Sequence, residues 1–182
     1  MLLFWERGYA SASISDLTNA MGIRPASLYA AFGSKAELYR SARERYFERE
    51  EPHWHVPTQG SSRAALDDLF DLAVRVVTRP DRPRGCMVAS GFVEYASDEQ
   101  DLAIETRAMR DRLRRNLVNL FRRGRDTGEF QSEAEPDALA RYVATVLEGL
   151  SIQARDGASI DQLKAVCLTA ARALPWAEPT EP

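Results

Sequence analysis

Apolar residues recur along this 182-residue chain with a period near 3.6 wherever a period can be recognised. No stretch of four to eight residues shows the alternation of β-branched and polar residues that is typical of a half-buried strand. Glycine and proline clusters divide the chain into about nine segments of helical length. The sequence therefore predicts an all-α protein, and its 45% apolar residues suffice for one sizeable core or for a small module joined to a larger one.

The N-terminal helices are short and have clear boundary signals. Ser13 with Asp16 three residues later matches a capping box, in which each side chain accepts a hydrogen bond from the other residue's backbone N–H. Gly22 ends the helix that this box begins. Pro25 falls in the first turn of the next helix, where its missing N–H costs no hydrogen bond. Residues 13–32 are therefore predicted to form two short helices joined by a tight turn.

A longer helix follows, and a change in composition marks its end. Ser34 with Glu37 matches a second capping box, from which a helix is predicted to run to about residue 49. The composition changes beyond Pro52, so the domain boundary is expected in or near this helix. The predicted division is an N-terminal domain of residues 1–50 and a larger helical domain of residues 51–182.

The two short helices have the pattern of a helix-turn-helix. Their apolar residues are spaced to bury one shared face: Leu17, Met21, Ile23, Leu28 and Phe32. Burial of that face turns the small residues of the second helix outward: Pro25, Ala26, Ser27, Tyr29 and Ala30. The N-terminal half of this helix is then able to enter a DNA major groove, which is about 12 Å wide.

The side chains on this outward face offer few contacts to bases. Ala26 can touch only a thymine methyl, Ser27 can make one hydrogen bond, and Tyr29 can reach a phosphate. Lys35 adds an ammonium at the positive N-terminus of the next helix, and Arg24 is the one long donor able to reach a guanine edge. Specificity should then come from two half-sites and from DNA shape, which requires a dimer.

The distribution of charge places any polyanion contact at the N-terminal end. The net charge is −3, but residues 1–50 have seven basic and six acidic side chains, whereas residues 51–182 have seventeen and twenty-one. Residues 24–45 contain five basic side chains and two acidic ones. A protein that coats nucleic acid without selectivity is therefore excluded, and local contact through the N-terminal domain is favoured.

Two short helices around a glycine turn are also common packing units, so periodicity alone leaves that alternative open. Residues 4–38 read FWERGYASASISDLTNAMGIRPASLYAAFGSKAEL. The aromatic-x-x-x-Gly-Tyr run, the IxDLxxAMGI segment and the SLYxxFxSKxxL run together resemble the DNA-binding domain of the TetR family of bacterial regulators. The resemblance implies a homodimer that binds operator DNA, a cavity for a small effector in the C-terminal domain, and repression that the effector relieves.

The resemblance and the side-chain chemistry together predict the DNA-binding residues: Ser13, Ser15, Arg24, Pro25, Ala26, Ser27, Tyr29, Ala31 and Lys35. In one respect the chain departs from the family. Members of the family have a helical turn or two, often with a basic arm, ahead of the position of Met1. The sequence leaves open whether upstream residues are missing or the first helix is short. A short first helix would bury less apolar surface, which would weaken DNA binding.

Beyond the N-terminal domain, the segment 86–96 is apolar nearly all round, which predicts a central helix. Ser90 and Glu94 are its polar exceptions at i and i+4, and a carboxylate on a buried helix must be paired, protonated or directed into a cavity. The residues proposed to line an apolar effector pocket are Phe70, Met87, Ser90, Phe92, Glu94, Tyr95 and Met109. The alternative is that Glu94 pairs with an arginine of the helix predicted at 98–125, and that the others are plain core. A pocket of this composition favours an apolar or aromatic small molecule.

The last two long helices, predicted at 137–153 and 159–174, are the candidates for the subunit interface. Their apolar surface is wider than one core-facing stripe, and small residues in the second allow close approach. Two such helices per chain can form a four-helix bundle across a two-fold axis. The predicted interface residues are Leu139, Tyr142, Val143, Val146, Leu147, Leu150, Leu163, Val166, Cys167 and Ala170.

Other functions lack the residues that they need. An enzyme would require convergent nucleophiles or bases, yet the two histidines, His53 and His55, stand in one loop, and no catalytic, cofactor or metal motif is present. Cys86 and Cys167 have no ligand spacing and fit a reducing compartment. With no membrane-spanning run or signal peptide, the chain is expected to be cytoplasmic. The alternative that remains is a partner protein that no longer binds DNA; activator and repressor are not distinguished by sequence.

Overall fold

The computed structural model describes residues 1–50, 56, 60–89, 91 and 95–178. In this part of the chain there are eight α-helices, one short 3-10 helix (Ser97–Glu99) and no strand beyond an isolated bridge between Phe130 and Trp176. The helices are α1 (Leu2–Ser11), α2 (Ile14–Met21), α3 (Pro25–Phe32), α4 (Lys35–Glu50), α5 (Ser62–Val77), α6 (Gln100–Asp126), α7 (Pro136–Arg155) and α8 (Ile160–Arg172). The prediction of an all-α fold with an N-terminal helix-turn-helix is confirmed.

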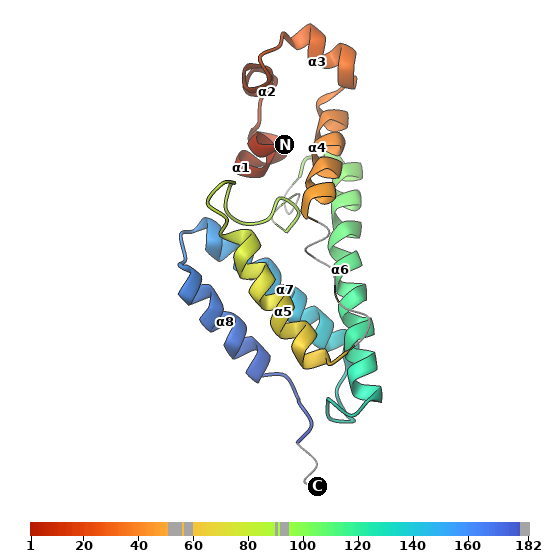
Figure 1. Ribbon diagram of the computed structural model, residues 1–182. Coiled ribbons are helices and arrows are strands. Elements are labelled where there is room, and N and C mark those ends of the chain that lie inside the picture. The colour runs from red at the N-terminus through yellow and green to blue at the C-terminus, as the bar shows by residue number, and fades with distance from the viewer. Residues whose placement is uncertain (51–55, 57–59, 90, 92–94, 179–182) are drawn as a thin grey trace.

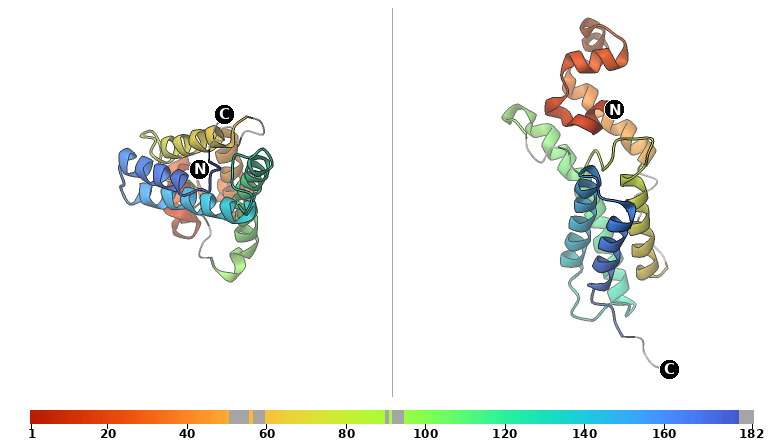
Figure 2. Two further views of the ribbon diagram at one scale, coloured as in Figure 1. Left: turned by 90° about the horizontal axis from the view of Figure 1, so that it is seen from below. Right: turned by 90° about the vertical axis from the view of Figure 1, so that its left-hand side faces the viewer.

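The molecule is elongated, with α1, α2 and α3 at one end (Figure 1). Helix α4 runs from this end toward the rest of the chain, and its Arg40 and Arg43 bond to the first half of α6 (Figures 1 and 2). Helices α5, α6, α7 and α8 form a bundle at the other end, and α7 contacts the other three. Helix α5 also contacts the other three helices of the bundle, and α4 connects the bundle to the small N-terminal helices.

Local signals set the boundaries of α2 as predicted. Ser13 Oγ accepts a hydrogen bond from the Asp16 backbone N–H, and the Asp16 carboxylate accepts one from the Ser13 backbone N–H, both at 3.0 Å. The hydrogen bonds from Ser13 hold the pKa of Asp16 below its ordinary value. Gly22 ends the helix with a φ of 67°, in the left-handed region that glycine enters without strain.

Two hydrophobic cores hold the chain together. The smaller lies within α1 to α4 and includes Phe4, Trp5 and Leu28. Met87 and Leu102, from distant parts of the sequence, belong to the same core, so the N-terminal helices pack directly on the neighbouring segments. The larger core fills the bundle of α5 to α8.

The helix predicted at 86–96 is not found in the described residues of that segment. Residues 87–89 form a turn, and among the described residues this accounts for the difference between the nine helices expected and the eight observed. Cys86, Met87 and Val88 are apolar because they are buried in the smaller core, and side chains from elsewhere pair with the backbone of this part of the segment. The Cys86 N–H donates to Ser151 Oγ (2.7 Å), and Arg110 Nη1 donates to the carbonyls of Val88 (2.9 Å) and Gly91 (2.8 Å). Burial without helical hydrogen bonds explains the apolar pattern.

Candidate functional site

Helix α3 presents a continuous outward face of small and polar residues. Leu28 is fully buried and Phe32 is half-buried, and both pack on the N-terminal core. The opposite side is exposed, and Tyr29 has 48% of its surface accessible. The exposed residues on this side of α3 are Pro25, Ala26, Ser27, Tyr29, Ala30 and Ala31. Met21 was expected on the shared buried face, but it is 42% exposed because it lies at the last turn of α2.

Helix α2 brings its N-terminal turn to the surface. Ser13 and Ser15 are both exposed. The Ser13 hydroxyl closes the capping box, with an additional 2.6 Å hydrogen bond to Asp16, so it is already engaged. The Ser15 side chain has no such role in the cap and faces solvent.

Two cations flank α3, one at each end. Arg24 is the N-cap residue of α3, where its side chain makes no capping hydrogen bond and is exposed. Lys35 follows α3 at the start of α4, with its Nζ 4.3 Å from the centroid of the Tyr9 ring. Burial lowers the pKa of Lys35, with an opposing effect from Glu99. The contact with Tyr9 limits the positions of the ammonium, and Lys35 is the first residue of α4, at the positive end of that helix.

An ion-pair cluster joins α4 to α6. Arg40 donates to both oxygens of Glu105 (3.0 and 3.2 Å from Nε), and Arg43, which is 5% exposed, pairs with the same carboxylate. Arg43 Nη1 also donates to the hydroxyl of buried Thr106 at 3.3 Å. The hydrogen bonds from Arg40 and Arg43 lower the pKa of Glu105 despite its partial burial. Helix α4 is thereby fixed to α6 near the N-terminal helices.

Replacing Glu105 by glutamine should lower the free energy of unfolding by about 2 kcal/mol at pH 7. Breaking a fully buried pair costs about 3–5 kcal/mol, and the 34% exposure of the Glu105 side chain reduces that cost. Because the folded pKa of Glu105 is depressed, its contribution is present above the ordinary value of 4.5 and is lost as the pH falls through the folded pKa.

Urea unfolding at pH 7 and pH 3 measures this effect, and the two proteins should differ less at pH 3. The matched control is Asp126→Asn, because Asp126 is exposed and its pair with Arg125 has a 3.6 Å separation. It should change stability by less than about 0.5 kcal/mol. A Glu105→Gln effect no larger than the control's would show that the cluster does not fix α4 to α6.

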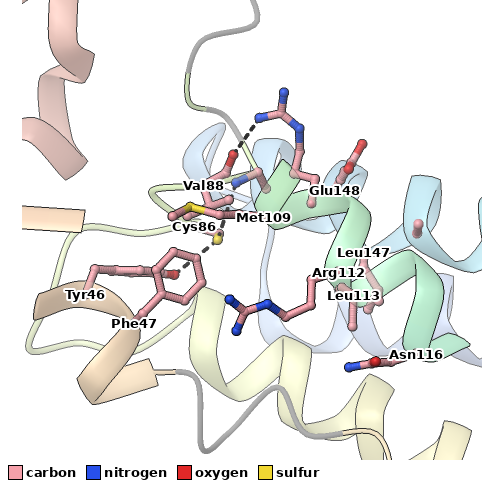
Figure 3. Close-up of a pocket in the computed structure, with 13 residues that line it drawn as sticks. Tyr46, Phe47, Cys86, Val88, Met109, Arg112, Leu113, Asn116, Leu147 and Glu148 are labelled. Atoms are coloured by element: carbon pink, nitrogen blue, oxygen red, sulfur yellow. Dashed lines mark hydrogen bonds between the residues drawn. The ribbon is translucent and has the colours of Figure 1, made fainter. Parts of the chain in front are cut away.

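A cavity of about 110 Å³ lies where α4, α6, α7 and the 86–89 segment meet (Figure 3). Its walls are mainly apolar, and its lining residues are Tyr46, Phe47, Cys86, Val88, Ala89, Met109, Arg110, Arg112, Leu113, Asn116, Ala144, Leu147 and Glu148. Tyr46 donates a hydrogen bond to Cys86 Sγ at 3.1 Å. The cavity therefore touches the last turns of α4, whose first residue follows α3 in the chain.

The predicted pocket residues have different positions. Met109 lines the cavity. Phe70 is buried in the bundle core and Met87 in the N-terminal core, so neither faces it, and Tyr95 is 45% exposed. Ser90, Phe92 and Glu94 lie outside the described residues.

Among the described residues that line the cavity, the acid is Glu148 of α7, which the sequence analysis did not predict. The sequence feature that could have indicated Glu148 is a carboxylate within a helix whose apolar surface is wider than one core-facing stripe.

The outer faces of α7 and α8 carry apolar residues that the chain itself does not cover. Six of the predicted interface residues are buried in the bundle core instead: Val143, Leu147, Leu150, Leu163, Cys167 and Ala170. Leu139 and Val146 are partly buried, and Tyr142 (39%) and Val166 (46%) are exposed. Tyr142, Val146 and Gly149 share one face of α7, and Gln153 of that face lines a surface depression with Val166 of α8.

Within the described residues no helix is long and apolar enough to cross a bilayer. The same part of the chain contains no group of three or more His, Cys, Asp or Glu side chains placed to hold a metal ion. His53 and His55 lie outside it.

Comparison with known proteins identifies relatives over almost the whole chain. Residues 1–42 match the family model of bacterial regulatory proteins of the tetR family, and residues 62–168 match that of the tetracyclin repressor-like C-terminal domain. The transcriptional repressors ComR and BdcR of Escherichia coli K12 are each 29% identical, over 96% and 94% of this chain and 85% and 82% of theirs. A structure of the regulator CifR with 26-bp operator DNA is 36% identical and covers 96% of this chain and 92% of its own, with a TM-score of 0.88. These relatives are named as regulators of transcription and not as enzymes.

Proposed function

The chain belongs to the TetR family of bacterial transcriptional regulators, and we propose that it is a cytoplasmic homodimer that represses transcription until a small molecule releases it from its operator. Within this proposal, residues 1–50 bind DNA, and residues 51–182 form the subunit interface and the effector pocket. The observation that carries the proposal is the outward face of α3, which has small exposed residues along its length and a cation at each end.

The proposed DNA contacts follow from the position of each side chain. Ala26 and Ser27, in the first turn of α3, are small enough to let the helix backbone approach base edges, and Arg24 reaches beside them. Tyr29 and Lys35 meet phosphates on either side of the groove, the latter together with the α4 N-terminus. The remaining contacts are proposed for Ser13, Ser15, Pro25 and Ala31. A solved relative, CifR, is complexed with operator DNA, which supports this assignment.

The proposed dimer uses the exposed side of α7 and α8. Tyr142, Val146 and Gly149 of one chain would pack with Val166 against the same surface of a second chain, as a four-helix bundle. The resulting two-fold axis would set two α3 helices about 34–36 Å apart, one turn of B-DNA. Each chain alone has few base-reading groups, so two half-sites are needed for specific binding.

The proposed release mechanism uses the contact between the cavity and α4. Tyr46 and Phe47 form one wall, and α6, α7 and residues 86–89 form the others. A molecule that enters this space has to displace α4 from α6 or hold the two in one arrangement, because packed interiors do not deform continuously. Since α3 leads directly into α4, either effect changes the separation of the two recognition helices and hence the affinity for both half-sites together.

Selection from a pool of random duplexes tests the proposal without any assumption about the target gene. The purified chain should enrich a two-fold symmetric sequence whose half-site centres are about 10 bp or slightly more apart. Enrichment of a single half-site would contradict the dimer. A pool that remains random after repeated rounds would contradict specific DNA binding altogether.

A further inference from the structure

Among the described residues that line the pocket of the proposed function, Glu148 is the acidic side chain, and the wall around it is mainly apolar. Glu148 lies on α7 beside Leu147 and one turn from Ala144, and all three line the cavity (Figure 3). Burial raises the pKa of the Glu148 carboxyl above its ordinary value, with a smaller opposing effect from Arg110. Among the described residues, none donates a hydrogen bond to this carboxylate. Glu148 is thus an acceptor that has lost part of its hydration without gaining a protein donor.

The charges around Glu148 limit which molecule can supply that donor. Arg110 and Arg112 line the same cavity, and the Arg110 guanidinium is held there by two backbone carbonyls. The neighbouring Asp111 pairs with Arg114 at 3.3 Å. Because Arg110 and Glu148 carry opposite charges, a cationic molecule would meet the Arg110 guanidinium and an anionic molecule would meet the Glu148 carboxylate, each as a like charge within apolar walls. An uncharged hydrogen-bond donor avoids both penalties.

The volume of the cavity limits the size of the apolar part of this molecule. An apolar cavity of about 150 Å³ is known to hold benzene. The 110 Å³ here, bounded by Phe47, Met109 and Leu113, is smaller, so the apolar body is no larger than one ring or a short branched chain.

We infer that the effector is a small uncharged hydroxyl compound, an alcohol or phenol, whose apolar body fills the cavity and whose hydroxyl donates to Glu148. This inference rests on the proposed function, because it assigns the chemistry of the pocket through which release is proposed to occur.

Four probes with one ring separate the contributions of shape, hydrogen bonding and charge. They are benzyl alcohol, toluene, benzylamine and benzoate, and calorimetry on the full chain at pH 7 gives their affinities. Benzyl alcohol should bind about tenfold more tightly than toluene, as expected for a hydrogen bond to a charged acceptor, and the two ions should bind more weakly than toluene. Equal affinities for toluene and benzyl alcohol, or tightest binding by either ion, would overturn the inference.

Variants test whether Glu148 causes the preference for benzyl alcohol over toluene. Glu148→Leu should bind toluene and benzyl alcohol equally, whereas Asp68→Leu, which removes an exposed carboxylate from α5, should keep the tenfold difference. Glu148→Gln conserves the shape and serves if the leucine variant does not fold; it should lose about threefold in affinity for the alcohol. A preference for the alcohol that persists in both Glu148 variants would overturn the assignment.

Release from DNA, measured with the same probes, distinguishes a failure of this inference from a failure of the proposed function. Benzyl alcohol should release the chain from its selected duplex at concentrations at which toluene does not. If the chain binds that duplex but shows no preference for the alcohol, the inference fails and the proposed function stands. If the chain enriches no duplex, the proposed function fails, and the chemistry assigned to the effector fails with it.

Discussion

Val166→Glu should convert the dimer to a monomer and weaken operator binding by about 100-fold or more. Val166 is 46% exposed in the isolated chain, so the substitution leaves the bundle core intact. In the proposed interface it places a carboxylate against the apolar face of α7 on the partner, where an uncompensated charge loses its hydration. Loss of the second half-site then removes the gain from bivalent binding, which is about 10²–10⁴ in favourable cases.

Sedimentation gives the mass of the assembly, and fluorescence anisotropy gives the affinity. The control is Ile104→Glu, because Ile104 is a similarly exposed apolar residue (49%) that lies on α6, away from the α7–α8 face. The control should remain dimeric. A Val166→Glu protein that still sediments as a dimer would show that the subunits associate through another surface.

Ser27→Glu should abolish specific DNA binding, with a loss of about 100-fold or more in the dimer. Ser27 is exposed in the first turn of α3, so the substitution does not disturb the core. Its new carboxylate would stand opposite the phosphates or acceptor-rich base edges of each half-site, and both subunits carry the penalty. Circular dichroism and sedimentation should match the wild type.

The matched control is Ser41→Glu, which adds the same charge at an exposed position of α4 about two turns from its N-terminus. Its effect should stay below about threefold at physiological salt, where charges are screened within about 8 Å. Equal losses in both variants would mean that net charge, rather than contact through α3, governs binding.

The helices of the N-terminal domain could be predicted because their signals are local. The reciprocal hydrogen bonds of Ser13 and Asp16 need only residues three apart, and Gly22 needs only its own backbone freedom. The outward face of α3 followed from the burial of Leu28 and Phe32 on one side of the helix. The prediction that Met21 is buried was wrong. Residue spacing shows which side chains share a face, but it does not show where the helix and its neighbours end.

The segment 86–96 could not be read correctly because its stabilising contacts are distant in sequence. Ser151 and Arg110 satisfy its backbone, and neither is indicated by an apolar run. A segment that is buried on all sides has the same apolar sequence pattern whether it is a helix or a turn enclosed by other elements. The cavity was missed for a related reason, since Glu148 becomes part of it only when α4 and α6 pack beside α7.

The proposed subunit interface shows a third limit of prediction from sequence. Helix α7 is apolar on two faces, one for its own bundle and one that remains exposed, and periodicity does not separate them. Val143 and Val146 differ by three positions, yet the first is fully buried and the second lies at the edge of the exposed face. The breadth of the apolar surface was the useful signal, and its division between core and interface required the packing of α5 and α6.

The measurement that tests the central claim most directly is fluorescence anisotropy of the full chain with the intergenic DNA upstream of its own gene, set against a shuffled duplex at several salt concentrations. A specific dimeric regulator should saturate at two chains per site and bind its site at least 10³-fold more tightly than the shuffled duplex. The logarithm of its affinity should fall with the logarithm of salt concentration with a slope of about −5 or steeper. Equal, weak binding to both duplexes at every salt concentration would contradict the claim.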